Sequence, residues 1–190
     1  MGWKNVDTVI PGRLYLGNIH AARSPRSITE RRITHIVSVC NDAIPAEIPE
    51  SGIAHLRVPV EDVDFADLLI WLPTACQFIE QAIAAGGVVL VHCNQGLTRS
   101  ATVVAAYLMC TRRIDATQAM SAVRQGLFLP CCPSPVSDGS YLTAREQVWF
   151  NAGFHEQLFL FELCRYQPSP ACPYYVGWRQ KLAAHLAGQT

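Results

Sequence analysis

Apolar residues along this chain alternate between short strand-like runs and longer stretches with helical spacing. Val88–His92 is an apolar run that ends in a histidine, and it predicts a buried strand. Ile33–Cys40 alternates and is rich in β-branched residues, which predicts another strand. Between these two runs, apolar residues recur at helical spacing from Leu69 to Ile83, until Gly86-Gly87 ends the pattern. The chain therefore mixes strands and helices.

Caps, glycines and prolines mark the other boundaries. Further strands are predicted over residues 13–16 and 54–60. Three further helices are predicted to begin at Ser27, Asp115 and Asn151, and two more to cover residues 99–112 and about 175–187. Pro73 lies early in the helix over 69–83 and marks either its first turn or a kink. Residues 126–143 contain three prolines and two glycines, which predict a loop or insertion.

This order of elements predicts the fold class. Strands that alternate with helices are typical of an α/β fold with a mostly parallel central sheet. We expect about five strands, with helices on both faces of the sheet. A length of 190 residues suits a single globular domain.

Composition limits the class of function. The chain has 15 basic and 15 acidic residues, so no charge excess favours nucleic acid or an anionic membrane as a partner. The longest apolar runs are too short to span a bilayer, and the N-terminus lacks a signal-peptide pattern. Eight cysteines include no Cys-x-x-Cys pair, which predicts mostly buried reduced thiols and no metal site. We expect a cytoplasmic and/or nuclear protein.

One stretch combines a nucleophile with an anion site. The predicted strand over 88–92 leads into Cys93, and six positions later Arg99 opens a predicted helix. The loop between them contains Gly96, and its N–H groups together with the helix N-terminus would form a cradle for an anion. The same field would favour the thiolate of Cys93, and the guanidinium of Arg99 matches phosphate oxygens two at a time.

This stretch resembles the cysteine-based protein tyrosine phosphatase superfamily, and more closely its small, atypical dual-specificity members, which lack a kinase-docking domain. The segment Val89–Ala101 (VLVHCNQGLTRSA) carries the resemblance. It is extended by Tyr15–Asn18, Ile33–Val37, Val58-Pro59, Ala106–Met109, Asn151–Phe154 and Gln157-Leu158. The resemblance implies a dual-specificity phosphatase catalytic domain over 1–166, with 126–143 as an insertion. Residues 167–190 would form a C-terminal helical extension that packs on the domain or trails from it.

The resemblance also implies roles for the residues of the loop. Cys93 would attack phosphorus and form a phosphocysteine, while Arg99 and the backbone amides of 94–99 would bind the phosphoryl oxygens. Thr98 would help the cysteine to leave, His92 would order the loop, and Ser100 would pair with loop carbonyls. The expected substrate-binding set is His92, Asn94, Gln95, Gly96, Leu97 and Ser100. No cofactor or metal is implied.

A general acid must protonate the leaving oxygen from another segment. The family places an aspartate after a Val-Pro strand end, and the sequence LRVPVED puts Asp62 at that position. Asp64 follows two residues later and is the alternative, whereas Asp67 is expected to cap the following helix. We therefore predict Asp62 as the acid.

Three functions are compatible with these residues. The first is a protein phosphatase acting on phosphotyrosine and on phosphoserine or phosphothreonine, with a phosphorylated protein as its partner. The second is a phosphatase of a phosphoinositide or an RNA 5′-phosphate, which the neutral residues 94–97 and the acidic loop opposite disfavour. The third is a phosphate-binding scaffold with incidental catalysis. Gln95 stands where the family commonly has alanine, and the sequence defines no oligomeric state.

Overall fold

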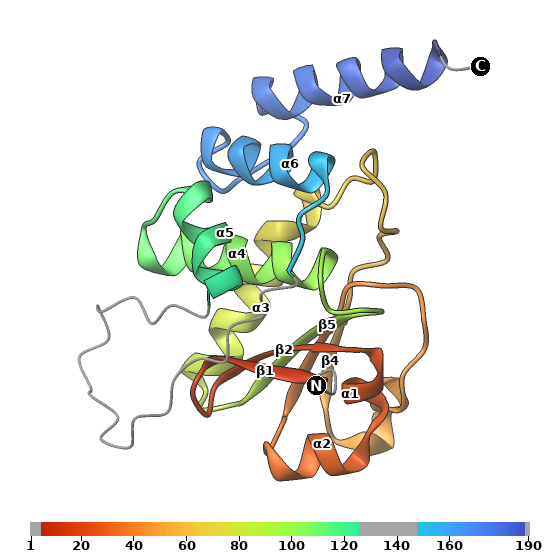
Figure 1. The fold of residues 1–190 in the computed structure, drawn as a ribbon, viewed down its shortest axis with the longest axis vertical. Coiled ribbons are helices and arrows are strands. Elements are labelled where there is room, and N and C mark those ends of the chain that lie inside the picture. Colours follow the sequence, from red (N-terminus) through yellow and green to blue (C-terminus); the bar gives the residue numbers. More distant parts are fainter. Residues whose placement is uncertain (1–4, 126–147, 189–190) are drawn as a thin grey trace.

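The structure is a computed structural model that describes residues 5–125 and 148–188. A five-stranded sheet lies at its centre, with helices on either side, and the C-terminal helix stacks on the outside (Figure 1). The α/β, single-domain prediction is confirmed. The predicted insertion at 126–143 lies outside the described residues.

The sheet has the order β1-β2-β5-β3-β4. Its strands are β1 (Val6–Ile10), β2 (Leu14–Asn18), β3 (His35–Ser38), β4 (Ala54–Arg57) and β5 (Val89–Cys93). β1 pairs antiparallel with β2, and the other neighbours are parallel. The sequence prediction missed β1, because this short, half-buried edge strand has no clear alternation. β4 ends at Arg57, earlier than predicted.

Two hydrophobic clusters cover the two faces of the sheet. α1 (Ile19–Arg23) and α2 (Pro25–Glu30) lie on one face, where Ile19 and Ala22 pack with Leu90 of β5. The opposite face is covered by α3 (Leu72–Ala84), α4 (Arg99–Arg112), α5 (Ala116–Gln125) and α6 (Ala152–Leu163). Val89 and Val91 join this larger cluster, since successive side chains of a strand point to opposite faces.

Short 3₁₀ turns and a final helix complete the described chain. The turns are η1 (Pro45–Glu47), η2 (Pro49–Ser51) and η3 (Leu69–Trp71), and the last helix is α7 (Pro173–Ala187). Because η3 leads directly into α3, Pro73 falls in the first turn of that helix and produces no kink. In the part of the chain that the structure describes, no helix is both long and apolar enough to cross a membrane.

The predicted caps at Asn151 and Asp115 are found in place, and the one at Ser27 is wrong. The Asn151 side chain accepts from Phe154 N–H at 2.7 Å, and Asp115 forms a capping box with Gln118 at the start of α5. Ser27, however, does not cap α2. That helix starts at Pro25, and Ser24 accepts the Ser27 N–H at 3.2 Å, because proline at the first helical position moves the cap upstream.

Candidate active site

The nucleophile candidate lies where the central strand turns into a helix. Cys93 ends β5, Arg99 begins α4, and the loop between them folds back over the thiol. The Gly96 N–H donates to Cys93 Sγ at 3.1 Å, and Gly96 has a φ of 74°, which a side chain would disfavour. The thiol is fully buried at the base of this loop. The predicted strand–loop–helix cradle is therefore present.

The hydroxyl groups of Thr98 and Ser100 make different contacts at the loop. Ser100 Oγ lies 3.2 Å from Cys93 Sγ and donates to it. The Thr98 hydroxyl instead donates to the carboxylate of Asp62. Thr98, which the sequence predicted to help the cysteine to leave, thus bonds to Asp62, and Ser100, which was expected to pair with loop carbonyls, bonds to the sulfur. Both residues are buried, and the contact between Ser100 and Cys93 is shielded from water.

The Arg99 guanidinium is buried, and the protein satisfies only part of its hydrogen-bonding capacity. One terminal nitrogen donates to the carbonyl oxygen of Val60 at 3.0 Å, which fixes the plane of the group. Nε lies 3.6 Å from Asp62 Oδ2 but makes no hydrogen bond within the described residues. A buried cation with an unsatisfied donor is suited to receive an oxygen of an anion.

Asp62 reaches the loop from the opposite side. One of its oxygens accepts from Thr98, and Asn151 Nδ2 donates to the other at 3.2 Å. The Asp62 side chain remains 34% exposed, so it borders both the loop and solvent. Of the two candidate acids, Asp62 is therefore the one whose carboxylate lies against Thr98 and Arg99.

The segment that carries Asp62 is attached to α6. The buried Gln157 side chain accepts from Leu68 N–H at 2.9 Å and Leu69 N–H at 2.7 Å, and it donates to Ala66 O at 2.8 Å. A Cβ on Gly153 would lie only 1.7 Å from the carbonyl oxygen of Asp64, so a glycine is needed there. Sequence reasoning singled out Gln157 only through the family resemblance, because its partners are distant in the chain.

The two carboxylate oxygens of Asp67 bind two different parts of the chain. Its Oδ1 accepts from Ile70 N–H at 3.3 Å, so it binds the first turn of η3. The N-cap residues of η3 and α3 are Leu68 and Trp71, however, so Asp67 is not the N-cap that the sequence predicted. Its Oδ2 accepts from Tyr175 Oη at 2.6 Å and from Arg179 at 2.9 Å, both on α7. Burial, and after it hydrogen bonding to the Asp67 carboxylate, raises the pKa of Tyr175 to about 12. The last helix is thus linked to the loop of Asp62.

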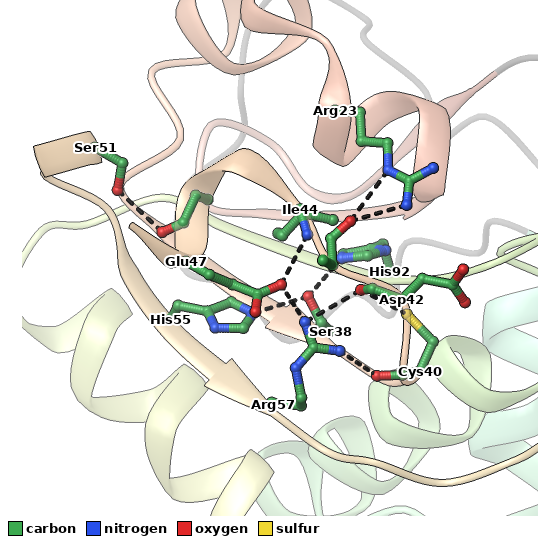
Figure 2. Close-up of polar contacts among 12 residues, drawn as sticks. Arg23, Ser38, Cys40, Asp42, Ile44, Glu47, Ser51, His55, Arg57 and His92 are labelled. Carbon is green, nitrogen blue, oxygen red and sulfur yellow. Dashed lines mark hydrogen bonds and ion pairs between the residues drawn. The ribbon is translucent and has the colours of Figure 1, made fainter. Parts of the chain in front are cut away.

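Behind the cysteine, two histidines and a serine form a chain of hydrogen bonds (Figure 2). His92 Nε2 lies 2.6 Å from Ser38 Oγ, and that oxygen lies 2.9 Å from His55 Nε2. Burial lowers the pKa of His92 to about 4, so its imidazole is neutral near pH 7. Burial also lowers the pKa of His55. Sequence reasoning missed Ser38 and His55, which carry no local motif.

Hydrogen bonds also hold the outer side of the loop between Cys93 and Arg99. Asn94 Nδ2 donates to Asp42 Oδ2 at 2.9 Å, and the Asn94 carbonyl accepts from Ile19 N–H at 3.2 Å. The Leu97 carbonyl accepts from Trp149 N–H, also at 3.2 Å. Figure 2 shows Arg57 directed at the carbonyl oxygens of Cys40 and Asp42, which supports the segment that holds Asn94. Gln95 is exposed at the rim.

The fold and the site together define a class. A buried thiol under an N–H-lined loop, beside an arginine and opposite a carboxylate, is the arrangement of a cysteine-based phosphatase. Over the ranges 5–125 and 148–188 there is no group of three or more His, Cys, Asp or Glu side chains that could hold a metal ion.

Comparisons with known proteins identify the family. A family model described as "Dual specificity phosphatase, catalytic domain" matches residues 14–164. The chain is 42% identical over 117 residues to dual specificity protein phosphatase Mpk3 of Drosophila melanogaster, covering 61% of this chain and 28% of that protein. It is 33% identical over 172 residues to dual specificity protein phosphatase 12 of Mus musculus, covering 90% and 45%.

Solved structures agree with the sequence matches. The crystal structure of human DUSP28 superposes with a TM-score of 0.70 at 31% identity, covering 87% of this chain and 97% of that one. The chain belongs to the dual specificity phosphatase family, and its domain is that of a cysteine-dependent protein phosphatase. It spans less than half of the length of either curated relative.

Proposed function

We propose that this protein hydrolyses phosphotyrosine and phosphoserine or phosphothreonine in protein substrates through a phosphocysteine intermediate. The observation that carries the proposal is the surroundings of Cys93 Sγ. The sulfur accepts hydrogen bonds from Gly96 N–H and Ser100 Oγ, which stabilise a thiolate. Arg99 and Asp62 converge on the same loop from the two sides.

In the first step, the Cys93 thiolate attacks phosphorus and the bond to the substrate oxygen breaks. The Nε of Arg99 and the loop N–H groups bind the equatorial phosphoryl oxygens, where negative charge is spread in the transition state. Asp62 gives its proton to the departing oxygen, so the substrate leaves as a neutral alcohol or phenol. The phosphoryl group is then bonded to Cys93.

In the second step, water attacks the phosphocysteine and the S–P bond breaks. Asp62, now a carboxylate, takes a proton from that water, and inorganic phosphate is released. The Ser100 hydroxyl donates to the sulfur at 3.2 Å, so it stabilises the thiolate as it leaves. We assign this function to Ser100 rather than to Thr98, whose hydroxyl bonds to Asp62 and orients its carboxylate.

The charge around the loop supports a singly phosphorylated side chain as the substrate. Residues 94–97 are neutral, and Glu61 and Asp64 are exposed on the segment opposite. Acidic groups at the rim repel a polyanion, so an inositol polyphosphate should be a poorer substrate than a phosphopeptide. The relatives' names, dual specificity protein phosphatases, support the same substrate class.

A panel of phosphotyrosine, phosphoserine and phosphothreonine peptides, with an inositol polyphosphate beside them, tests this proposal. Wild-type protein should release phosphate fastest from peptides. Cys93→Ser should release none but should still bind them. Asp62→Asn should lower kcat by about 10²–10⁴ on peptides, because the leaving oxygen loses its proton source.

Asp64→Asn is the matched control for the acid. Asp64 lies two residues from Asp62 on the same exposed segment, so the variant changes the local charge equally. It should keep most of the activity. Full activity in Asp62→Asn with loss in Asp64→Asn would reassign the acid, and faster turnover of the inositol polyphosphate would contradict the substrate class.

A further inference from the structure

Two cysteines outside the catalytic loop lie in direct contact. Cys164 caps the C-terminal end of α6, and Cys172 stands immediately before α7. Their Sγ atoms are 2.9 Å apart, and both are reduced thiols. Cys164 is 6% exposed, whereas Cys172 is only partly buried, so a small solute can reach the second thiol more easily.

The turn between the cysteines is ordered by its own backbone. Tyr166 N–H donates to Phe161 O at 2.8 Å, Gln167 N–H to Cys164 O at 3.0 Å, and Cys172 N–H to Ser169 O at 2.8 Å. These bonds stabilise a reversal of the chain direction that brings the two thiols into contact. A disulfide needs an S–S distance of about 2.0 Å, so the sulfurs must approach by only roughly 1 Å. The dithiol is therefore nearly in bonding position.

We propose that Cys164 and Cys172 form a reversible, redox-active pair that a peroxide converts into a disulfide. Cys172 is the thiol that reacts first, because it is the more exposed one and stands at the N-terminus of a 15-residue helix. Contact with the Cys164 thiol and with N–H groups at the start of α7 also lowers the pKa of Cys172. Burial raises the pKa of Cys164, so Cys164 stays protonated until it reacts.

The reaction balances with hydrogen peroxide as oxidant. The Cys172 thiolate attacks one peroxide oxygen and breaks the O–O bond, which gives a sulfenic acid and a hydroxide that takes up a proton. Cys164 then attacks the sulfenic sulfur, the S–O bond breaks, and water leaves as the disulfide forms. The two thiols lose two electrons and two protons, and one peroxide becomes two waters.

The disulfide would hold the start of α7, the helix that binds the segment of Asp62. Tyr175 and Arg179 of α7 hold Asp67, which belongs to the same segment as Asp62. A covalent link between the end of α6 and the start of α7 restricts how far this helix can leave that segment. The inference rests on the thiol geometry and is independent of the proposed substrate.

Peptide mapping of the peroxide-treated chain tests the pair. Cys93→Ser serves as the background, so that oxidation of the catalytic thiol does not intervene. Arg165 lies between the two cysteines, so trypsin places them in separate peptides unless a disulfide joins them. Non-reducing mass spectrometry should find peptide 146–165 linked to peptide 166–179, two hydrogens lighter than their sum, and dithiothreitol should separate them.

Cys172→Ser should abolish the linked pair, and Cys110→Ser, at another partly exposed cysteine, should retain it. The melting temperature should rise by a few degrees on oxidation in the background protein, but not when Cys172→Ser is added. Alkylation of both Cys164 and Cys172 after a treatment that oxidises other thiols would overturn the proposal. So would a disulfide that joins Cys172 to a different cysteine.

Discussion

At the residue scale, two hydroxyl groups of the catalytic loop point in different directions: Thr98 donates to Asp62 and Ser100 donates to the sulfur of Cys93. Cys93, Arg99 and Asp62 could be located from their spacing and from a family resemblance. The contacts of the Thr98 and Ser100 hydroxyls could not be predicted, because their directions depend on how the loop enters α4. Thr98 has φ −115° and ψ −79° just before the helix, and this turn directs its hydroxyl toward Asp62 while Ser100 remains over the sulfur.

The buried, neutral His92 makes stability depend on pH. An unfolded histidine titrates near pH 6.5, whereas burial lowers the pKa of His92 to about 4 in the folded protein. Between these values the unfolded chain binds a proton that the folded chain does not, so stability falls as pH falls. Between pH 7 and pH 5 this single group should remove about 2 kcal/mol from the free energy of unfolding.

Urea unfolding at the two pH values measures this effect. His92→Gln should be less stable than wild type at pH 7 but should lose about 2 kcal/mol less on acidification. His155→Gln, an exposed histidine on α6, should keep the wild-type dependence on pH. Equal losses in wild type and His92→Gln would show that another group is responsible.

At the scale of elements, the segment that carries Asp62 is held by helices distant in sequence. Asn151 binds Asp62 itself, Gln157 binds residues 66–69, and Tyr175 binds Asp67. Helical periodicity and caps located these helices in the sequence, and the bounds of α4 matched the prediction. Periodicity does not show which polar side chains cross to another element, so these contacts could not be predicted.

Gln157→Leu should destabilise the protein strongly. The fully buried amide accepts from two backbone N–H groups and donates to one carbonyl, and leucine would remove all three bonds, although Leu68 N–H would keep its 3.1 Å bond to Ala66 O. We expect a loss of about 2–4 kcal/mol in the free energy of unfolding, measured with urea. Gln77→Leu, an exposed glutamine on α3, should change it by less than about 0.5 kcal/mol. A similar loss in both variants would refute the buried bridge.

Tyr175→Phe tests the link between α7 and the site. Removal of the hydroxyl breaks the 2.6 Å bond to Asp67, which should cost about 1 kcal/mol of stability. Because the Asp62 segment becomes less restrained, kcat on a phosphopeptide should fall while KM changes little. Tyr174→Phe, next to it but 54% exposed, should behave as wild type in both measurements. A fall in stability without a change in kcat would show that α7 stabilises the fold but does not affect catalysis.

At the scale of the whole molecule, the order of the strands places the site. β5 lies between β2 and β3, so Cys93 emerges at the carboxyl edge of the parallel strands, next to the end of β3. Ligand sites of α/β sheets form at this edge. Alternation of strands and helices predicted a parallel sheet, but not that the last strand in sequence would occupy its centre. That order is decided by two hydrophobic clusters that bury both faces of β5.

The nucleophile is the central claim, and a quenched-flow experiment tests it most directly. Wild-type protein is mixed with a radiolabelled phosphotyrosine peptide, quenched in acid within the first turnover, and digested with trypsin. The label should appear on the peptide that contains Cys93, and Cys93→Ser should acquire none and release no phosphate. Phosphate release by wild type without a labelled Cys93 peptide, or by Cys93→Ser, would contradict the proposed mechanism.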